Sequence, residues 1–130
     1  MPAPESAAVA VARAHVEAWA RHDFDAVRAS LTEDVHVVTT TVDPAAPIVN
    51  TTGADVYMEG LIRFAQAVLP GTTEVTWEVG DDTHAMLGVT SRVKFGPDAP
   101  ELTLHGARVY LLDANRKVTE ERVAFVVLPA

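Results

Sequence analysis

Apolar residues in the first half of the chain recur every three or four positions, the spacing of one face of an α-helix. This pattern predicts helices from Ala7 to about Arg21, from Asp23 to Glu33-Asp34, and from Ala54 to about Val68. Asp23 is a good N-cap for the second helix, and Pro70-Gly71 stops the third. The expected buried positions are Val9, Ala12, Val16 and Trp19 in the first helix, Phe24, Val27 and Leu31 in the second, and Tyr57, Leu61, Phe64 and Val68 in the third.

Alternating and β-branched segments elsewhere in the chain predict strands. Val35–Val42 is the first of these strands, and Thr73–Val79 and His84–Phe95 follow the third helix. The segment Asp43–Thr52 carries two prolines and is predicted to be a loop. Helices followed by a meander of strands predict an α+β fold, in which three helices from the N-terminal half pack on one face of a curved antiparallel sheet, a cone-shaped, cystatin-like roll.

The last two strands form a predicted hairpin over Thr103–Val127, with its turn at Asp113–Arg116. A turn symmetric about Ala114-Asn115 places Arg108 opposite Glu121. The same register pairs Tyr110 with Thr119, Gly106 with Val123, and Leu104 with Phe125, all on one side of the sheet. An arginine opposite a glutamate among aromatic and aliphatic side chains predicts a polar spot inside an apolar pocket.

The opposite side of this hairpin is also largely apolar. Its predicted members are Ala107, Val109, Leu111, Val118, Ala124 and Val126, interrupted by His105, Glu120 and Arg122. A large apolar surface of this kind usually contacts a partner.

Composition narrows the classes of function. The chain has 130 residues, which predicts one domain over residues 1–130, and its formal net charge is −8. A negative chain repels nucleic-acid backbones and anionic membrane surfaces, so neither is expected as a partner. No apolar run is long enough to cross a bilayer, and the N-terminus lacks the positive region of a signal peptide. The expected compartment is therefore the cytoplasm.

Three residues are candidates for catalysis. Glu121 could act as a general base or orient a water molecule, while Arg108 stabilises developing negative charge. The alternative for this pair is a structural ion pair. Histidine is the side chain that ordinarily titrates near neutrality, so His15 is the natural acid–base candidate from the first helix. Its alternative is a half-exposed histidine at the edge of the apolar stripe.

Aromatic, hydroxyl and aliphatic side chains would form the walls of the pocket. The candidates for binding a small apolar organic ligand are Trp19, Thr39, Tyr57, Tyr110, Val123 and Phe125. For the aromatic residues the alternative is a plain place in the core. The chain has no cysteine, and none of its five histidines pair at metal-ligand spacing on a helix. No metal and no cofactor are therefore expected.

Two segments carry a resemblance to a known family. The segment AHVEAWARHDFDAVRASLTEDVHVV, residues 14–38, and the ending NRKVTEERVAF, residues 115–125, resemble the nuclear transport factor 2-like superfamily. Thr52-Gly53-Ala54-Asp55 resembles its third-helix start. The superfamily includes polyketide cyclases, ketosteroid isomerase and limonene epoxide hydrolase, and the chain looks most like the polyketide cyclase (SnoaL-like) branch. The resemblance implies a homodimer packed sheet to sheet, and the apolar side of the hairpin suits that arrangement.

The family's catalytic residues carry over only in part. The helix-1 tyrosine of the isomerase falls at His15, its catalytic aspartate at Thr39 and its second acid at Arg108. A hydroxyl and a permanent cation do not supply the carboxylate base and neutral acid that steroid enolisation needs. The epoxide hydrolases use two carboxylates on either side of an arginine, and Arg108 with Glu121 supplies one arm. The cyclases commonly pair a histidine with an acid, and Glu121 stands where the family's ending often has histidine.

Two hypotheses of function follow. The first is an enzyme without a cofactor, an isomerase, cyclase or hydrolase that uses Glu121, Arg108 and His15. The second is a module of the same fold that binds a small ligand or dimerises without catalysis. Two titratable groups that converge in one cavity would favour the enzyme.

Overall fold

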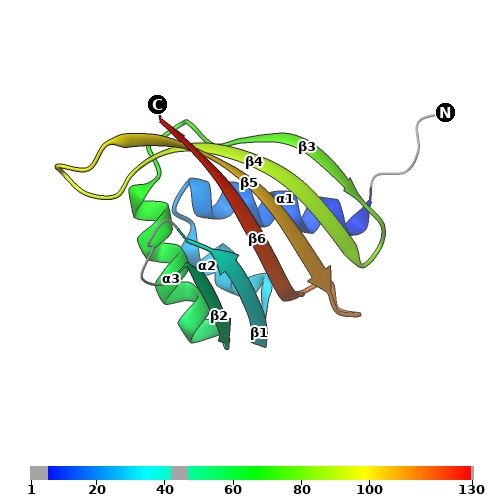
Figure 1. Ribbon diagram of the computed structural model, residues 1–130. Helices are drawn as coiled ribbons and strands as arrows, with labels where there is room; N and C mark the ends of the chain where they lie inside the picture. The colour runs from blue at the N-terminus through cyan, green and yellow to red at the C-terminus, as the bar shows by residue number, and fades with distance from the viewer. Residues whose placement is uncertain (1–5, 42–46, 130) are drawn as a thin grey trace.

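Three helices and six strands make up the protein in the computed structural model, which describes residues 6–41 and 47–129 (Figure 1). The elements are α1 (Ala7–Ala20), α2 (Phe24–Ala29), β1 (Leu31–Thr40), β2 (Ile48–Thr52), α3 (Ala54–Ala67), β3 (Glu74–Gly80), β4 (His84–Lys94), β5 (Glu101–Leu112) and β6 (Val118–Pro129).

The strands form one curved sheet in the order β2-β1-β6-β5-β4-β3. Neighbouring strands are antiparallel except β1 and β6, which run parallel, so the sheet is mixed rather than purely antiparallel. Helix α1 packs against β3, β4 and β5, whereas α3 packs against β1 and β2 (Figure 1). The predicted α+β plan, with helices on one face of a curved sheet, is confirmed.

Local signals start the helices where the sequence places them. The Ser6 side chain accepts a hydrogen bond from the backbone of Val9 and caps α1. Asp23 does the same for α2 through the backbone of Ala26. Gly53 precedes α3 and has a φ of 115°. Residues with a Cβ rarely adopt this backbone conformation. No helix in the described part of the chain is long and apolar enough to cross a membrane.

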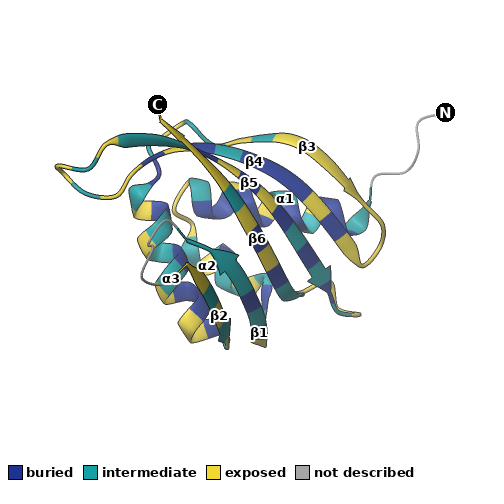
Figure 2. Ribbon diagram, in the orientation of Figure 1, coloured by how far each residue is buried: buried dark blue, intermediate teal, exposed yellow. Residues whose placement is uncertain are grey.

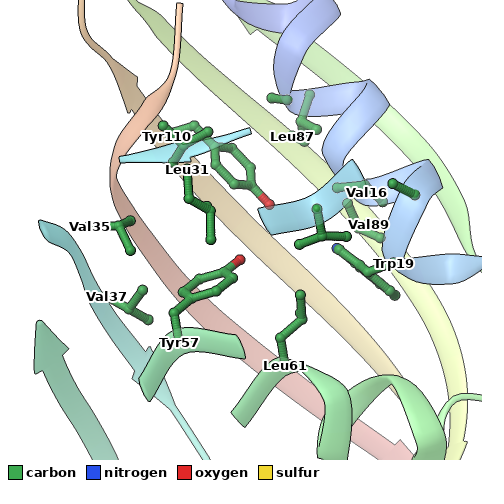
Figure 3. Close-up of a cluster of buried hydrophobic side chains, with 14 of the residues drawn as sticks. Val16, Trp19, Leu31, Val35, Val37, Tyr57, Leu61, Leu87, Val89 and Tyr110 are labelled. Carbon is green, nitrogen blue, oxygen red and sulfur yellow. The ribbon is translucent and has the colours of Figure 1, made fainter. Parts of the chain in front are cut away.

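The core lies between the helices and the inner face of the sheet. Alternate residues of β4 and β5 are buried, as expected for strands with one covered face (Figure 2). Figure 3 shows the centre of this core, to which α1, α3 and the inner strands contribute. Its labelled members are Val16, Trp19, Leu31, Val35, Val37, Tyr57, Leu61, Leu87, Val89 and Tyr110.

The second predicted helix is too long. It ends at Ala29, and Leu31, which was expected on its buried face, begins β1 instead. The backbone of Val118 donates a 2.7 Å hydrogen bond to the carbonyl of Ser30, and Leu31 pairs with Val118 in the parallel β1–β6 ladder. This pairing joins residues far apart in the sequence, so helical periodicity alone could not reveal it.

The predicted loop Asp43–Thr52 is wrong in its last part. Ile48–Thr52 forms β2, an edge strand that pairs antiparallel with β1. Residues 42–46 lie outside the described part of the chain. The segment's prolines favoured a loop, but an edge strand tolerates nearby proline because one of its sides needs no hydrogen bonds.

The register predicted for the closing hairpin is wrong by two residues. Arg108 pairs with Val123 rather than Glu121, and Glu121 pairs with Tyr110. The turn extends to Lys117, whose carbonyl accepts a hydrogen bond from the backbone of Asp113, and the register shifts once more between Leu111 and Leu112. Since a shift by two preserves which side each residue faces, Arg108 and Glu121 still point to the same side as diagonal neighbours. Val118, which was predicted on the outer face, is buried in the core, because the shift between Leu111 and Leu112 leaves one extra residue in β6 beside it.

Candidate functional site

A cavity of about 330 Å³ lies between α3 and the inner face of the sheet. Its apolar walls are Val37, Val49, Val56, Leu61, Phe64, Phe95, Leu104, Val123 and Phe125, together with Gly60. Its polar lining consists of Thr39, Thr40, Thr41, Thr51, Tyr57, Arg63, Arg108 and Glu121. A mainly apolar cavity with a few converging polar groups is the usual form of a site for a small molecule.

Arg108 brings a positive charge to this cavity. Its guanidinium lies 5.1–5.6 Å from the ring centres of Trp19, Phe64 and Phe125, close enough for cation–π attraction. The residue is only 4% exposed, and its Nε has no hydrogen-bond partner among the described residues. Its nearest charge is Glu121, at 3.8 Å from Nη1 to Oε2. This distance is an ion pair but exceeds a hydrogen bond.

Glu121 is the buried acid of the site, at 3% exposed. The hydroxyl of Tyr57, from α3, lies 3.2 Å from each of its carboxylate oxygens. His15 Nε2, from α1, lies 3.6 Å from Oε2. Glu121 on β6 is thus surrounded by groups from both long helices and from β5.

His15 is fully enclosed, at 2% exposed, so the alternative of a half-exposed helix histidine is wrong. Its Nδ1 lies 2.9 Å from the hydroxyl of Ser30 and its Nε2 lies 2.8 Å from the hydroxyl of Tyr57. Ser30 donates its own hydrogen to the carbonyl of Val27 at 2.6 Å. The Ser30 oxygen therefore accepts from Nδ1, which fixes a proton on that nitrogen.

Complete hydrogen bonding along this chain needs one more hydrogen than neutral His15, Tyr57 and an ionised Glu121 supply. The His15–Tyr57 and Tyr57–Glu121 contacts need two hydrogens, and the Tyr57 hydroxyl supplies one. The second hydrogen lies on His15 Nε2 or on the carboxyl of Glu121. The pair of His15 and Glu121 therefore has no net charge when its hydrogen bonds are complete, and the proton belongs to the pair.

Electrostatics favour an ionised Glu121 within this pair. Burial by itself raises the pKa of Glu121, but hydrogen bonding with His15 and the positive charge of Arg108 outweigh it, so the pKa lies below its ordinary value. Burial, followed by the charge of Glu121, raises the pKa of Tyr57 well above its ordinary value. Tyr57 therefore stays protonated, and its hydroxyl donates a hydrogen bond to the carboxylate of Glu121.

The predicted site residues divide into two layers. Glu121 and Arg108 line the cavity, and so do four of the predicted ligand-binding residues: Thr39, Tyr57, Val123 and Phe125. His15 contacts the cavity only through Tyr57 and Glu121. Trp19 and Tyr110 are 0% exposed, are not among the lining residues, and lie behind Arg108 and Glu121 in the core.

Two buried polar atoms behind the cavity have no partner. They are Nε1 of Trp19 and the hydroxyl of Tyr110, which have no hydrogen-bond partner among the described residues. Figure 3 shows that the Tyr57 and Tyr110 hydroxyls point toward one another across the core cluster. Unpaired polar atoms are rare in protein interiors, and they concentrate here around one cavity wall.

Several residues of the site were not identified in the sequence analysis. Ser30, which fixes the His15 tautomer, ends α2 and carries no distinctive motif. Val49 and Thr51 line the cavity from β2, which was predicted as loop. Arg63 and Gly60 share a row of α3 with Val56, and the spacing of three and four residues was a usable signal. No group of three potential metal-ligating side chains occurs in the described part of the chain.

The chain matches one known protein family and shares its fold with several solved structures. A family model for the SnoaL-like domain matches residues 12–121. No curated protein matches the chain significantly.

Among solved structures, an LEH-like epoxide hydrolase from M. tuberculosis is 22% identical, with a TM-score of 0.70 over 95% of this chain and 86% of that one. An epoxide hydrolase/cyclase-like enzyme, SalBIII, from pyran ring formation in the polyether salinomycin is 15% identical, with a TM-score of 0.71 and 95% of each chain covered. An NTF2-like protein of unknown function from Cytophaga hutchinsonii is 13% identical, with a TM-score of 0.68 over 96% and 95% of the two chains. At these identities the likeness establishes the fold.

The buried charge of Arg108 leads to a prediction about stability. Arg108→Met leaves Glu121 without its cation in the interior, and we expect this to lower the free energy of unfolding by about 3–5 kcal/mol. Arg122→Met is the control, because Arg122 forms a surface ion pair with Glu120 and its side chain is 64% exposed. Thermal unfolding checks the pair of variants, and equal melting temperatures would show that the Arg108–Glu121 pair contributes nothing beyond a surface contact.

The pKa of Glu121 leads to a second prediction. Because the pKa is lowered on folding, ionised Glu121 contributes stability above its ordinary pKa of about 4.5, and this contribution is lost as the pH falls through the lower value of the folded state. The stability difference between the wild type and Glu121→Gln should therefore be largest near neutral pH and shrink in acid. Urea unfolding at several pH values measures it, with Glu59→Gln on the exposed side of α3 as the control. A stability difference between the wild type and Glu121→Gln that does not change with pH would contradict the lowered pKa of Glu121.

Proposed function

Because the chain belongs to the SnoaL-like domain family, we propose that it is an enzyme of the polyketide-cyclase-like branch. It performs acid–base chemistry on a small organic carbonyl compound held in the cavity between α3 and the sheet. The observation that supports this proposal best is the convergence of a buried acid, Glu121, and a buried cation, Arg108, at one apolar cavity. Hydrolases, cyclases and isomerases share this fold, so the fold does not distinguish between these reactions and the proposal depends on the residues of the site.

In the proposed reaction Glu121 is the general base. It removes a proton from the carbon next to the substrate carbonyl, and the negative charge that develops on the carbonyl oxygen is stabilised by the Arg108 guanidinium. The unpartnered Nε of Arg108 supports this role, because a buried donor without an acceptor favours a ligand oxygen there. Returning the proton to another carbon isomerises the substrate, whereas attack of the enolate on a second carbonyl closes a ring.

Tyr57, His15 and Ser30 complete the proton path. The hydroxyl of Tyr57 contacts both Glu121 and His15, so a proton accepted by the carboxylate can be shared along the chain. Ser30 holds the ring of His15 from behind and fixes its tautomer. We assign His15 and Ser30 as positioning residues, because neither lines the cavity.

A second candidate is a ligand-binding protein without catalysis. The lowered pKa of Glu121 favours it, because a carboxylate stabilised by His15 and Arg108 is a weaker base than a free one. The cavity and its apolar walls serve binding equally well. The two candidates differ in one respect: only the enzyme moves a proton on or off the ligand.

Hydrogen–deuterium exchange tests the proposed function. Wild-type protein in deuterated buffer should accelerate deuterium incorporation next to the carbonyl of short ketones and 3-oxo esters, 2-octanone among them, as followed by NMR. Glu121→Gln should lower the catalysed rate by about 10²–10⁴-fold, the usual contribution of a general base. Glu59→Gln should retain the wild-type rate. Ligands that bind to the wild type without accelerated exchange would support the binding protein instead.

We also propose that the outer face of the sheet pairs with a second copy of the chain. Large apolar side chains are exposed on this face of β3, β4 and β6: Trp77, Val79, Met86, Val126 and Leu128. Cross-strand partners put Val79 beside Met86, and Trp77 lies against Gly88, so the exposed side chains of β3 and β4 form one apolar cluster. A surface of this kind on a monomer would be a liability for aggregation.

Sedimentation velocity tests the dimer. The wild type should sediment as a dimer at micromolar concentration, and Val126→Lys should shift it toward monomer because a lysine charge would be buried at the interface. Gln66→Lys introduces the same charge on the exposed side of α3 and should leave the dimer intact. A wild-type protein that is monomeric throughout this range would rule out the proposed interface.

A further inference from the structure

The cavity has an excess of positive charge although the chain as a whole is acidic. The chain carries 18 acidic and ten basic residues. The charged residues that line the cavity are Arg63, Arg108 and Glu121, two cations and one acid. A ligand that enters this cavity therefore meets a local charge opposite to that of the protein as a whole.

Glu121 does not cancel this excess. The hydrogen count above makes the His15–Glu121 pair neutral as a unit when its hydrogen bonds are complete. The charge of Arg108 is then left without a full counter-charge, in spite of its 3.8 Å contact with Glu121. With His15 behind its wall, the site therefore has a net positive charge, with Arg108 in the interior and Arg63 at the exposed end.

Arg63 is the exposed one of the two cations, and it has no assigned partner. Six of the eight arginines lie in ion pairs of the described structure: Arg13, Arg21, Arg28, Arg92, Arg108 and Arg122. The side chains of the other two, Arg63 and Arg116, have no ion pair or hydrogen bond among the described residues. Arg116 lies in the β5–β6 turn, whereas Arg63 lines the cavity.

Helix α3 sets the distance between Arg63 and the reacting groups. Arg63 follows Tyr57 by six residues, so the two positions are about 9 Å apart along the helix axis at 1.5 Å per residue. Gly60 lies between them on the cavity wall, and a Cβ added there would meet no atom within 4 Å. The cavity is therefore open beside Gly60, and apart from the two arginines and Glu121 its lining carries no charge.

We propose that the ligand is an oxo acid, with its carbonyl oxygen at Arg108 and its carboxylate about one extended alkyl chain away at Arg63. The apolar walls hold the chain in between, and Arg63 supplies the charge-assisted contact at the opening. The position of the carbonyl at Arg108 rests on the proposed function. The new element is the chemical class of the substrate. It makes Arg63 a specificity-determining residue.

A matched pair of ligands tests the proposal. 7-Oxooctanoate and 2-octanone share the methyl ketone and the alkyl chain and differ in the terminal carboxylate. Isothermal titration should show that the wild type binds the oxo acid at least about fivefold more tightly than the ketone. This preference should diminish as the ionic strength rises, because the contact lies at the exposed end of the cavity.

Three variants locate the anion site. Arg63→Gln should abolish the preference for 7-oxooctanoate with little change in the affinity for 2-octanone, and Arg63→Lys should retain most of it. Arg116→Gln, which removes the other unpaired arginine, should bind both ligands as the wild type does. A preference that survives Arg63→Gln, equal binding of the two ligands by the wild type, or binding of neither would overturn the proposal.

The outcomes separate this proposal from the proposed function. Deuterium exchange reports on Glu121, whereas the preference for the carboxylate reports on Arg63. An enzyme that exchanges 2-octanone and 7-oxooctanoate equally well, with equal affinities, retains the proposed function but not the oxo-acid assignment. A protein that prefers 7-oxooctanoate through Arg63 and exchanges neither ligand retains the assignment but not the catalysis.

Discussion

The structure depends on keeping one carboxylate, that of Glu121, inside the protein. A buried charge without partners is strongly unfavourable, so each group around Glu121 must be held in place by its own element. His15 comes from α1, Tyr57 from α3 and Arg108 from β5, while Glu121 itself is on β6. Satisfying this one charge therefore ties the two long helices to the centre of the sheet.

The same arrangement produces the cavity. Arg108 is stacked among Trp19, Phe64 and Phe125, which hold its guanidinium on the inner face of the sheet and leave its Nε without a partner. A cation held in this way can bind a ligand oxygen, and little free energy is spent on reorganising the site when the ligand binds. The contacts of His15 and Tyr57 with Glu121 complete the site, because a proton that the carboxylate accepts can be shared along these hydrogen bonds. Stability and the proposed chemistry thus rest on the same four side chains.

Individual residues show what could be predicted from the sequence. The faces of β5 and β6 followed from alternation, so Arg108 and Glu121 were placed on one side even though their register was wrong by two residues. His15 was a candidate because it is a titratable side chain on the first helix, but its contacts with Ser30 and Tyr57 join residues that are distant in the sequence. Ser30 and Arg63 were not identified, since a serine at a helix end and an arginine on a helix are common without any role in a site.

The sequence by itself determined where the three helices begin, which side Arg108 and Glu121 face, and the acidic character of the chain, because these follow from capping residues, local periodicity and composition. Tertiary structure alone decided the parallel pairing of β1 with β6, the edge strand β2 and the open space beside Gly60. Each of these depends on contacts between segments far apart along the chain. The hydrogen-bond chain from Ser30 to Glu121 depends on such contacts too, because only the folded chain brings four residues from four elements within reach of a single proton.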